Sequence, residues 1–389
     1  MKENPRNRGL AATLTLTGIP ASLGVVCLSP VLPLMEEAYS SQPEVIPFVK
    51  YVSVCIGIGM VMGAPIAGAV SDRFGRRVTL VIAVIAFCFC GSLGYWFDHV
   101  PTLILLRTLT GVGAAAILTI GVALMGELYK DGERDRLIGI NAMCSSLAAI
   151  ATVSLSGLLG AYSFKLPFLL HLLPAPMLLM VLAFVPHAAN ARKDTKMAAG
   201  KLSFAHWTTL ALALASGIAI FSIPVYLPFF MRDAGLANPI LNGVILAFMS
   251  VCSAFFAAFY GKARHHLSIG AAFRSALILL VIGCSILMVS SQIAAFVIAA
   301  MFLGCGMAWV APNLMTAANL LSVDSNRGRI VGLVKGANLS GSFLAVLLLD
   351  PIYRFAGACA TLGALALFAT VLATIGTMPL KSLGKNTSG

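Results

Sequence analysis

Long apolar runs separated by short polar segments fill almost the whole chain. A helix needs about 20 apolar residues to cross the ~30 Å hydrocarbon core of a bilayer, and the runs meet this length. The pattern predicts twelve membrane-spanning helices, at residues 10–34, 46–68, 78–96, 101–124, 137–160, 166–186, 205–229, 239–260, 271–290, 293–320, 330–350 and 356–379. We therefore expect an all-α membrane protein.

Composition agrees with this pattern. Hydrophobic residues make up 59% of the 389 residues and charged residues only 10%, whereas a soluble domain is roughly 25% charged. This balance excludes a soluble globule. The first run follows basic residues, as a signal peptide does, but it is longer than the ~7–15 residues of a signal-peptide core, so we expect it to stay as the first helix.

The net charge of +12 comes mostly from lysine and arginine residues in the predicted loops. The 26 lysine and arginine residues are spread along the chain, which argues against a nucleic-acid surface, and most of them fall on the same side as the N-terminus. Cytoplasmic loops of membrane proteins carry such an excess of positive residues. We expect a multi-pass protein of a bacterial inner (plasma) membrane, with both termini in the cytoplasm.

The two halves of the chain repeat each other at an offset of 193 positions. Residues 131–139 recur as 324–332, and the same offset relates glycines of the first, second and fourth runs to glycines of the second half. We expect two pseudo-symmetric six-helix bundles, at 1–186 and 205–389, joined by a cytoplasmic linker at 187–204.

The segment 68–80, between the second and third runs, carries the most specific pattern. It places one aspartate and three arginines within six positions, between apolar runs. The segment resembles the loop between the second and third helices of the major facilitator superfamily, Gly-x-Leu-x-Asp-Arg-x-Gly-Arg-Arg, with Val70 in place of the leucine. The resemblance implies two six-helix bundles and a conformational latch at their cytoplasmic side, formed by Gly68, Asp72, Arg73, Gly75, Arg76, Arg77, Arg134 and Arg327. We expect its arginines to bridge to acids such as Glu127, Asp131 or Glu133.

A second motif opens the fourth helix. Residues 105–115 resemble the superfamily pattern Leu-x-x-Arg-x-x-Gln-Gly-x-Gly, with Thr110 in place of the glutamine. Arg107 lies about 9 Å inside the membrane, where a charge costs at least ~2.5–3.5 kcal/mol. We expect it to act in coupling or substrate binding; snorkelling to the outer surface is the alternative. Residues 156–161 lack the proline of Gly-Pro-x-x-Gly-Gly, which is usual in proton-coupled drug exporters of this superfamily.

Other polar and aromatic residues lie inside apolar runs, and each has a structural alternative. His171 can carry a proton or serve as a structural donor. Trp309 and Asn313 can line a central cavity or pack in the core. Lys335 can face the substrate or snorkel to the cytoplasm, and Asn338 lies one turn deeper on the same face.

No acidic residue falls in the middle of a predicted span. Exporters of cationic drugs usually need a buried carboxylate, whereas this chain offers Arg107, so we expect neutral or anionic cargo. Proton coupling then runs through a group at a helix end, namely Glu127, Asp72 or Glu36. Lys50 falls on the outer side, and Glu36 is otherwise expected to be solvated.

The resemblance implies a secondary active transporter that works by alternating access, most similar to the drug and small-metabolite exporters. We expect proton-coupled efflux of small amphiphilic molecules; uptake or uniport of an organic anion or siderophore-like compound is the alternative. The sequence has no catalytic constellation, nucleotide-binding loop or metal-ligand spacing, so we expect neither an enzyme nor a cofactor, with the proton gradient as energy source. The expected partners of a monomer are the small-molecule substrate, protons and the lipid bilayer, without nucleic acid.

Overall fold

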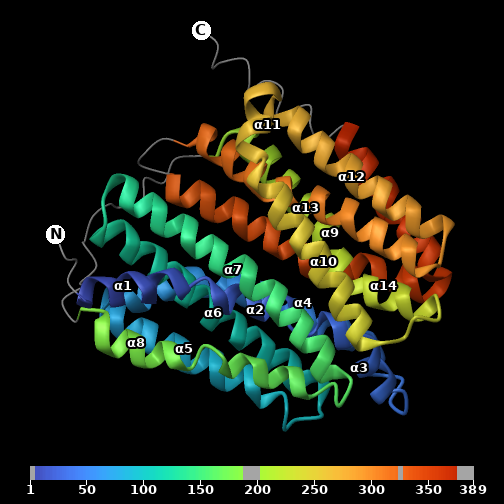
Figure 1. Ribbon diagram of the computed structural model, residues 1–389, viewed down its shortest axis with the longest axis horizontal. Coiled ribbons are helices and arrows are strands. Elements are labelled where there is room, and N and C mark those ends of the chain that lie inside the picture. The colour runs from blue at the N-terminus through green and yellow to red at the C-terminus, as the bar shows by residue number, and fades with distance from the viewer. Residues whose placement is uncertain (1–4, 187–201, 323–326, 375–389) are drawn as a thin grey trace. The chain divides into compact units, whose positions relative to one another are not determined.

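The computed structural model describes residues 5–186, 202–322 and 327–374, and these ranges are helices joined by short connections (Figure 1). The chain forms two compact units, residues 1–194 and 195–389. The predicted linker at 187–204 lies outside the described residues as far as residue 201. In Figure 1 the helices α1 to α8 of the first unit run from blue to green, and α9 to α14 of the second from yellow-green to red.

The first unit contains six membrane-spanning segments, two of which are broken. Its elements are α1 (Pro5–Leu16), α2 (Ile19–Val26), the 3-10 turn η1 (Ser29–Val31), α3 (Leu32–Ala38), α4 (Ile46–Phe74), α5 (Arg76–Leu93), α6 (Val100–Leu128), α7 (Asp131–Gly160), the 3-10 segment η2 (Leu166–Leu172) and α8 (Pro176–Phe184). Prolines begin most of the short pieces, because proline lacks the N–H that a helix interior needs and fits a first turn. The first span is therefore α1 to α3 in succession, rather than one helix over 10–34.

The second helix is longer than predicted. The α4 helix continues through the polar segment to Phe74, and the chain turns only at Gly75, whose φ of 85° is the left-handed conformation that glycine adopts readily. Nothing before Gly75 breaks the helix, so the charged residues of this segment lie on two consecutive helices, α4 and α5, and not in a loop.

The second unit repeats the same plan. Its elements are α9 (Phe204–Asp233), α10 (Pro239–Ala258), α11 (Tyr260–His266), α12 (Ile269–Val289), α13 (Ile293–Leu321) and α14 (Arg327–Thr374). Eleven segments of the described chain are long and apolar enough to cross a membrane. The last, Arg329–Thr374, would be about 69 Å long if straight, and it is broken at Gly357, where φ is 79° and ψ is −175°. This segment therefore holds the two final predicted spans.

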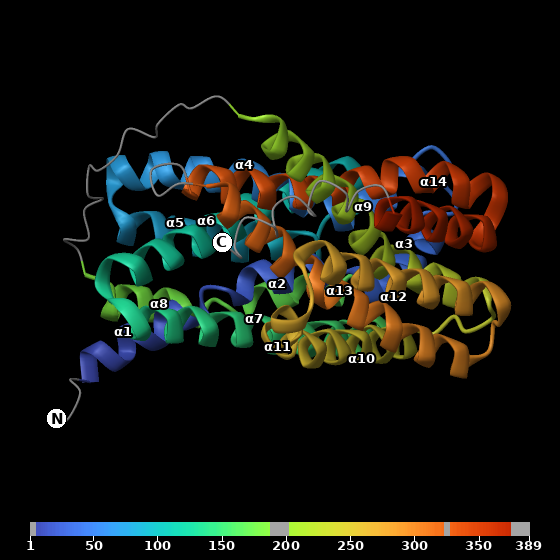
Figure 2. The ribbon, with the colours of Figure 1, turned by 90° about the horizontal axis from the view of Figure 1, so that it is seen from above.

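Glycine contacts confirm the pseudo-symmetry of the two units. A Cβ added to Gly111 would lie 2.2 Å from the carbonyl oxygen of Ile56, which shows how closely α6 packs on α4; the two helices lie side by side in Figure 2. In the second unit, a Cβ at Gly304 would lie 2.2 Å from the carbonyl oxygen of Met249. Both partners are shifted by the 193 positions found in the sequence. The same offset relates a second pair of contacts. A Cβ at Gly113 would approach the carbonyl oxygen of Ala83, and a Cβ at Gly306 would approach that of Ala276.

Candidate functional site

Arg107 lies at the centre of the first unit. Its side chain is 1% exposed, on α6 seven residues after the helix begins. Its Nε donates to the carbonyl oxygen of Val52 at 3.1 Å, its Nη2 to the carbonyl oxygen of Gly24 at 2.5 Å, and its Nη1 to Nε2 of His171 at 2.7 Å. The guanidinium therefore joins the first, second, fourth and sixth spans, and its side chain does not snorkel to the outer surface.

His171 is neutral in this arrangement. Because a guanidinium only donates hydrogen bonds, Nε2 of His171 must accept from Arg107, and Nδ1 then carries the proton and donates to the carbonyl oxygen of Phe168 at 2.9 Å. The ring also packs against Phe87, with 5.4 Å between centroids. A Cβ at Gly91 would come within 2.5 Å of the imidazole, so only glycine leaves room for the ring there.

The positive charge of Arg107 is not neutralised by a described acidic side chain. Its partners are two backbone carbonyl groups and a neutral imidazole, and in the described part of the chain no carboxylate forms an ion pair with it. Carbonyl dipoles and hydrogen bonds compensate for part of the lost hydration, but the unit charge remains. The region is thus set to attract an anion and to repel a cation.

A second cation is buried in the first unit, and here the expectation that Glu36 is solvated is wrong. Lys50, expected on the outer side, is 0% exposed on α4. Its Nζ lies 3.8 Å from Oε1 of Glu36 on α3, and the Glu36 side chain is only 14% exposed rather than solvated. The α4 helix begins at Ile46, so Lys50 already lies one turn inside it, and the nearby acid offsets part of the cost of burying its charge.

The polar segment 68–80 forms contacts inside the first unit. Arg76 pairs with Glu127 at the end of α6, one of the acids expected for it. Arg77 donates to the carbonyl oxygen of Leu182 on α8 at 2.5 Å. Asp72 and Arg73 are exposed. These contacts connect the start of the third span to the fourth and sixth spans.

The remaining residues of the predicted latch show little contact. A Cβ at Gly68 would meet no atom within 4 Å inside its unit. Among the described side chains, Arg134 pairs with its neighbour Asp135, and both are exposed. Arg327 begins α14, and its side chain lies outside the described residues, as does that of Asp131.

In the second unit, Trp309 and Asn313 lie together in the packed interior. The indole Nε1 of Trp309 donates to the carbonyl oxygen of Phe256 at 3.0 Å, and the two rings stack at 4.8 Å between centroids. Asn313 is 0% exposed; its Nδ2 donates to the carbonyl oxygen of Trp309 at 2.7 Å, and its Oδ1 accepts from the Tyr260 hydroxyl at 3.2 Å. The pair joins α13 to α10 and α11.

Asn338 and Lys335 lie one turn apart on α14 but in different surroundings. The Nδ2 atom of Asn338 donates to the carbonyl oxygen of Ala213 at 3.0 Å and to the Ser216 hydroxyl at 3.3 Å, which ties α14 to α9. Lys335 is exposed. The contacts thus separate two residues that the sequence placed on one face.

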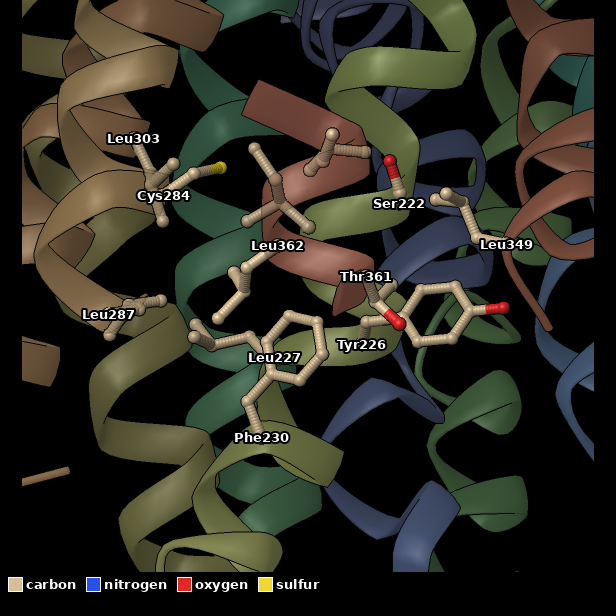
Figure 3. Close-up of a pocket in the computed structure, with 12 residues that line it drawn as sticks. Ser222, Tyr226, Leu227, Phe230, Cys284, Leu287, Leu303, Leu349, Thr361 and Leu362 are labelled. Carbon is tan, nitrogen blue, oxygen red and sulfur yellow. The ribbon is translucent and has the colours of Figure 1, made fainter. Parts of the chain in front are cut away.

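Figure 3 shows a pocket of the second unit between α9, α12, α13 and α14, lined mainly by apolar side chains such as Leu227, Leu362 and Phe230. Its free volume is about 10 Å³, the space of a single water molecule. The hydroxyl groups of its lining residues Ser222 and Thr361 donate to carbonyl oxygens of their own helices, at Ile218 and Gly357. The pocket is too small to hold an organic cargo.

Comparison with known proteins identifies the family. The profile of the Major Facilitator Superfamily matches residues 14–346. The chain belongs to the Major Facilitator Superfamily. It is similar to a probable 4-methylmuconolactone transporter of Cupriavidus pinatubonensis, 29% identical over 48% of this chain and 47% of that protein. It is also similar to multidrug resistance protein 1 of Bacillus subtilis, 29% identical over 41% of each chain. The matches span less than half the length of these relatives.

Solved structures of superfamily members share the fold. The D-xylose-proton symporter superposes with a TM-score of 0.76, at 17% identity, over 96% of this chain and 99% of that one. The nucleoside transporter NupG gives a TM-score of 0.73 at 10% identity, over 98% of this chain and 99% of that one. At these identities the likeness concerns the fold. The chain is therefore a multi-pass membrane protein with the superfamily's fold of two six-helix bundles, as the sequence predicted.

Sequence reasoning found Arg107 and His171 but not the groups that hold them. Gly24 and Val52 contribute carbonyl oxygens, and any residue type has a carbonyl, so no side-chain pattern marks them. Gly91 was detectable in principle, because a glycine inside an apolar helix often marks a close approach. Lys50 was visible as a charge next to an apolar run, but its burial depends on where α4 begins.

Proposed function

We propose that this superfamily member is a secondary active transporter that works by alternating access and exports small amphiphilic molecules, neutral or anionic, in exchange for protons. The observation that carries the proposal is the buried Arg107 without a carboxylate partner among the described residues. At an effective dielectric constant near 20, a unit charge 10 Å away interacts with it by about 1.7 kcal/mol. An anion gains this energy and a cation loses it, so the first unit favours anionic over cationic cargo.

The relatives support a small organic cargo. One is named for the transport of 4-methylmuconolactone and another for multidrug resistance. Both names describe small organic molecules, and the members with sugar and nucleoside cargo share only the fold with this chain. Export by this chain is an inference from the multidrug relatives, which also include the multidrug transporter MdtP of Bacillus subtilis.

In this proposal, carboxylates at helix ends carry the proton. Glu127 is paired with Arg76 and Glu36 with Lys50, so protonation of either acid would release a cation and loosen the contact between two spans. His171 is less suited to this role, because its Nε2 already accepts from Arg107. It can take a second proton only after Arg107 turns away.

The proposal can be tested in proteoliposomes with two fixed-charge bicyclic probes, naphthalene-2-sulfonate as the anion and N-methylquinolinium as the cation. Neither probe changes its charge with pH, and the membrane potential is clamped with potassium and valinomycin. Proton antiport predicts that naphthalene-2-sulfonate accumulates in vesicles that are acidic inside. Accumulation in vesicles that are acidic outside would instead indicate symport, and equilibration without response to pH would indicate uniport. Either result would refute proton-coupled export.

A further inference from the structure

The first unit contains a second cavity, separate from the Arg107 network. It lies between α2, α7 and the broken sixth span formed by η2 and α8, and its volume is about 290 Å³. Leu23 and Met177 are among the buried residues of its wall, and Leu155 and Leu173, at 40% and 57% exposed, belong to its accessible part. Arg107 and its three hydrogen-bond partners are not part of the lining.

The broken spans account for this cavity. Pro174 and Pro176 separate η2 from α8, so the sixth span does not pack along α7 as one continuous helix. In the second unit, α14 packs closely on α9 at the position equivalent to Ala148 of the cavity. Gly341, which lies 193 positions after the cavity residue Ala148, packs so tightly on α9 that an added Cβ would lie 2.6 Å from the backbone of Gly217.

The chemistry of the wall restricts what fits inside. Of the described residues that line the cavity, Thr152 alone has a polar side chain, and none is charged. Thr152 is 2% exposed, and its hydroxyl has no hydrogen-bond partner in the described part of the chain. The hydroxyl oxygen is not among the fully buried polar atoms that lack a partner, so it is accessible from the cavity. A water molecule would need two to four polar partners to be held, and the side chains provide one.

We propose that this cavity binds an uncharged lipophilic molecule with a single hydrogen-bonding group, such as a medium-chain alcohol or a phenol. Its volume is about twice that of an engineered cavity that binds benzene, which gives room for about a dozen heavy atoms. The molecule's polar group pairs with the Thr152 hydroxyl, and its hydrocarbon part contacts the leucine and methionine side chains. The residues that line the cavity belong to membrane-spanning segments, so the ligand is supplied by the bilayer, where such molecules concentrate.

The test uses 3-azioctanol, an eight-carbon alcohol with a photoreactive diazirine, on the full chain in phospholipid nanodiscs. After irradiation, mass spectrometry maps the adducts. The site predicts saturable labelling concentrated on the cavity segments of α7 and α8, at least fivefold above other exposed apolar segments such as those of α12. Excess 1-octanol removes the labelling, and ionised octanoate does not. Equal labelling along all exposed helices, or equal competition by octanoate, would overturn the proposal.

Two variants and one matched control sharpen the result. Leu155→Trp fills the cavity from its exposed part and lowers labelling at least fivefold, whereas Leu348→Trp, at the equivalent and also exposed position of the second unit, leaves it unchanged. Thr152→Val keeps the shape and lowers the apparent affinity for the alcohol about three- to tenfold, as expected for one neutral hydrogen bond. Unchanged labelling in Leu155→Trp contradicts the site. Labelling in detergent that is lost in nanodiscs shows that lipid acyl chains occupy the cavity, which also refutes the proposal.

Discussion

Gly91 holds open the space that His171 needs, and replacing Gly91 with cysteine tests this packing directly. A Cβ at Gly91 would lie 2.5 Å from Cγ of His171, about 1 Å closer than carbon atoms normally approach. His171 would have to move by about that distance, which stretches its 2.7 Å hydrogen bond with Arg107 to roughly 3.7 Å and breaks it. Losing a hydrogen bond to a charged group costs about 1.5–3 kcal/mol, and overpacking adds about 1–3 kcal/mol.

Cysteine is the informative choice because Cys284 occupies the equivalent position of the second unit, where it is buried without an opposing imidazole. We expect Gly91→Cys to lower the apparent melting temperature in nanodiscs by roughly 5–20 °C, at about 2–4 °C per kcal/mol. The control Gly126→Cys, on α6 with no atom within 4 Å of an added Cβ, should shift it by less than about 2 °C. Scans at one rate keep the variants comparable.

The double variant Gly91→Cys/His171→Ala completes a mutant cycle. Both single variants lose the Arg107–His171 hydrogen bond, but the double variant loses it only once and contains no clash. Its melting temperature should therefore exceed the additive value by at least about 5 °C, because residues in contact are not independent. Shifts that add to within about 1 °C would refute the packing argument.

Three further predictions concern other contacts of the first unit. Lys50→Met removes the cation paired with Glu36 and should destabilise the protein by up to about 3–5 kcal/mol. The double variant Lys50→Met/Glu36→Leu should melt at a temperature closer to that of the wild type. A double variant less stable than Lys50→Met would contradict a buried ion pair. Gly75→Ala should cost about 1–3 kcal/mol because its φ of 85° suits only glycine, while Gly68→Ala in the open part of α4 should be nearly neutral in the same thermal scan. Arg76→Gln removes the partly exposed ion pair with Glu127 and should change the stability by at most about 1 kcal/mol in low salt. A larger loss of stability that persists in 1 M salt would show that the pair is effectively buried.

Most of the fold could be predicted because its signals are local or periodic. Span length follows from runs of apolar residues, and the duplication follows from one offset between the halves, which the contacts of Gly111 and Gly304 reproduce. The turn at Gly75 was also readable. The division of the first and sixth spans into short pieces was harder to predict, because the neighbouring helices determine whether a proline bends a membrane helix or breaks it.

The interior of the candidate site could be predicted only in part. A charge in an apolar run marks Arg107, but its partners are carbonyl oxygens of Gly24 and Val52, whose availability depends on how the helices pack. Lys50 illustrates the same limit, since whether it is buried depends on the start of α4 and on Glu36 lying opposite. Patterns along a chain identify charged residues whose burial costs free energy, and tertiary packing determines which groups offset that cost.

We propose that the buried charge of Arg107 makes this protein prefer anionic cargo, and replacing Arg107 tests the proposal. The ratio of naphthalene-2-sulfonate flux to N-methylquinolinium flux is compared in proteoliposomes of the wild type and of Arg107→Gln, with reconstituted protein quantified. An anion gains and a cation loses about 1.7 kcal/mol at 10 Å, so the wild-type ratio should exceed the variant's by at least tenfold. Equal ratios in the two proteins would show that the charge of Arg107 does not select the cargo.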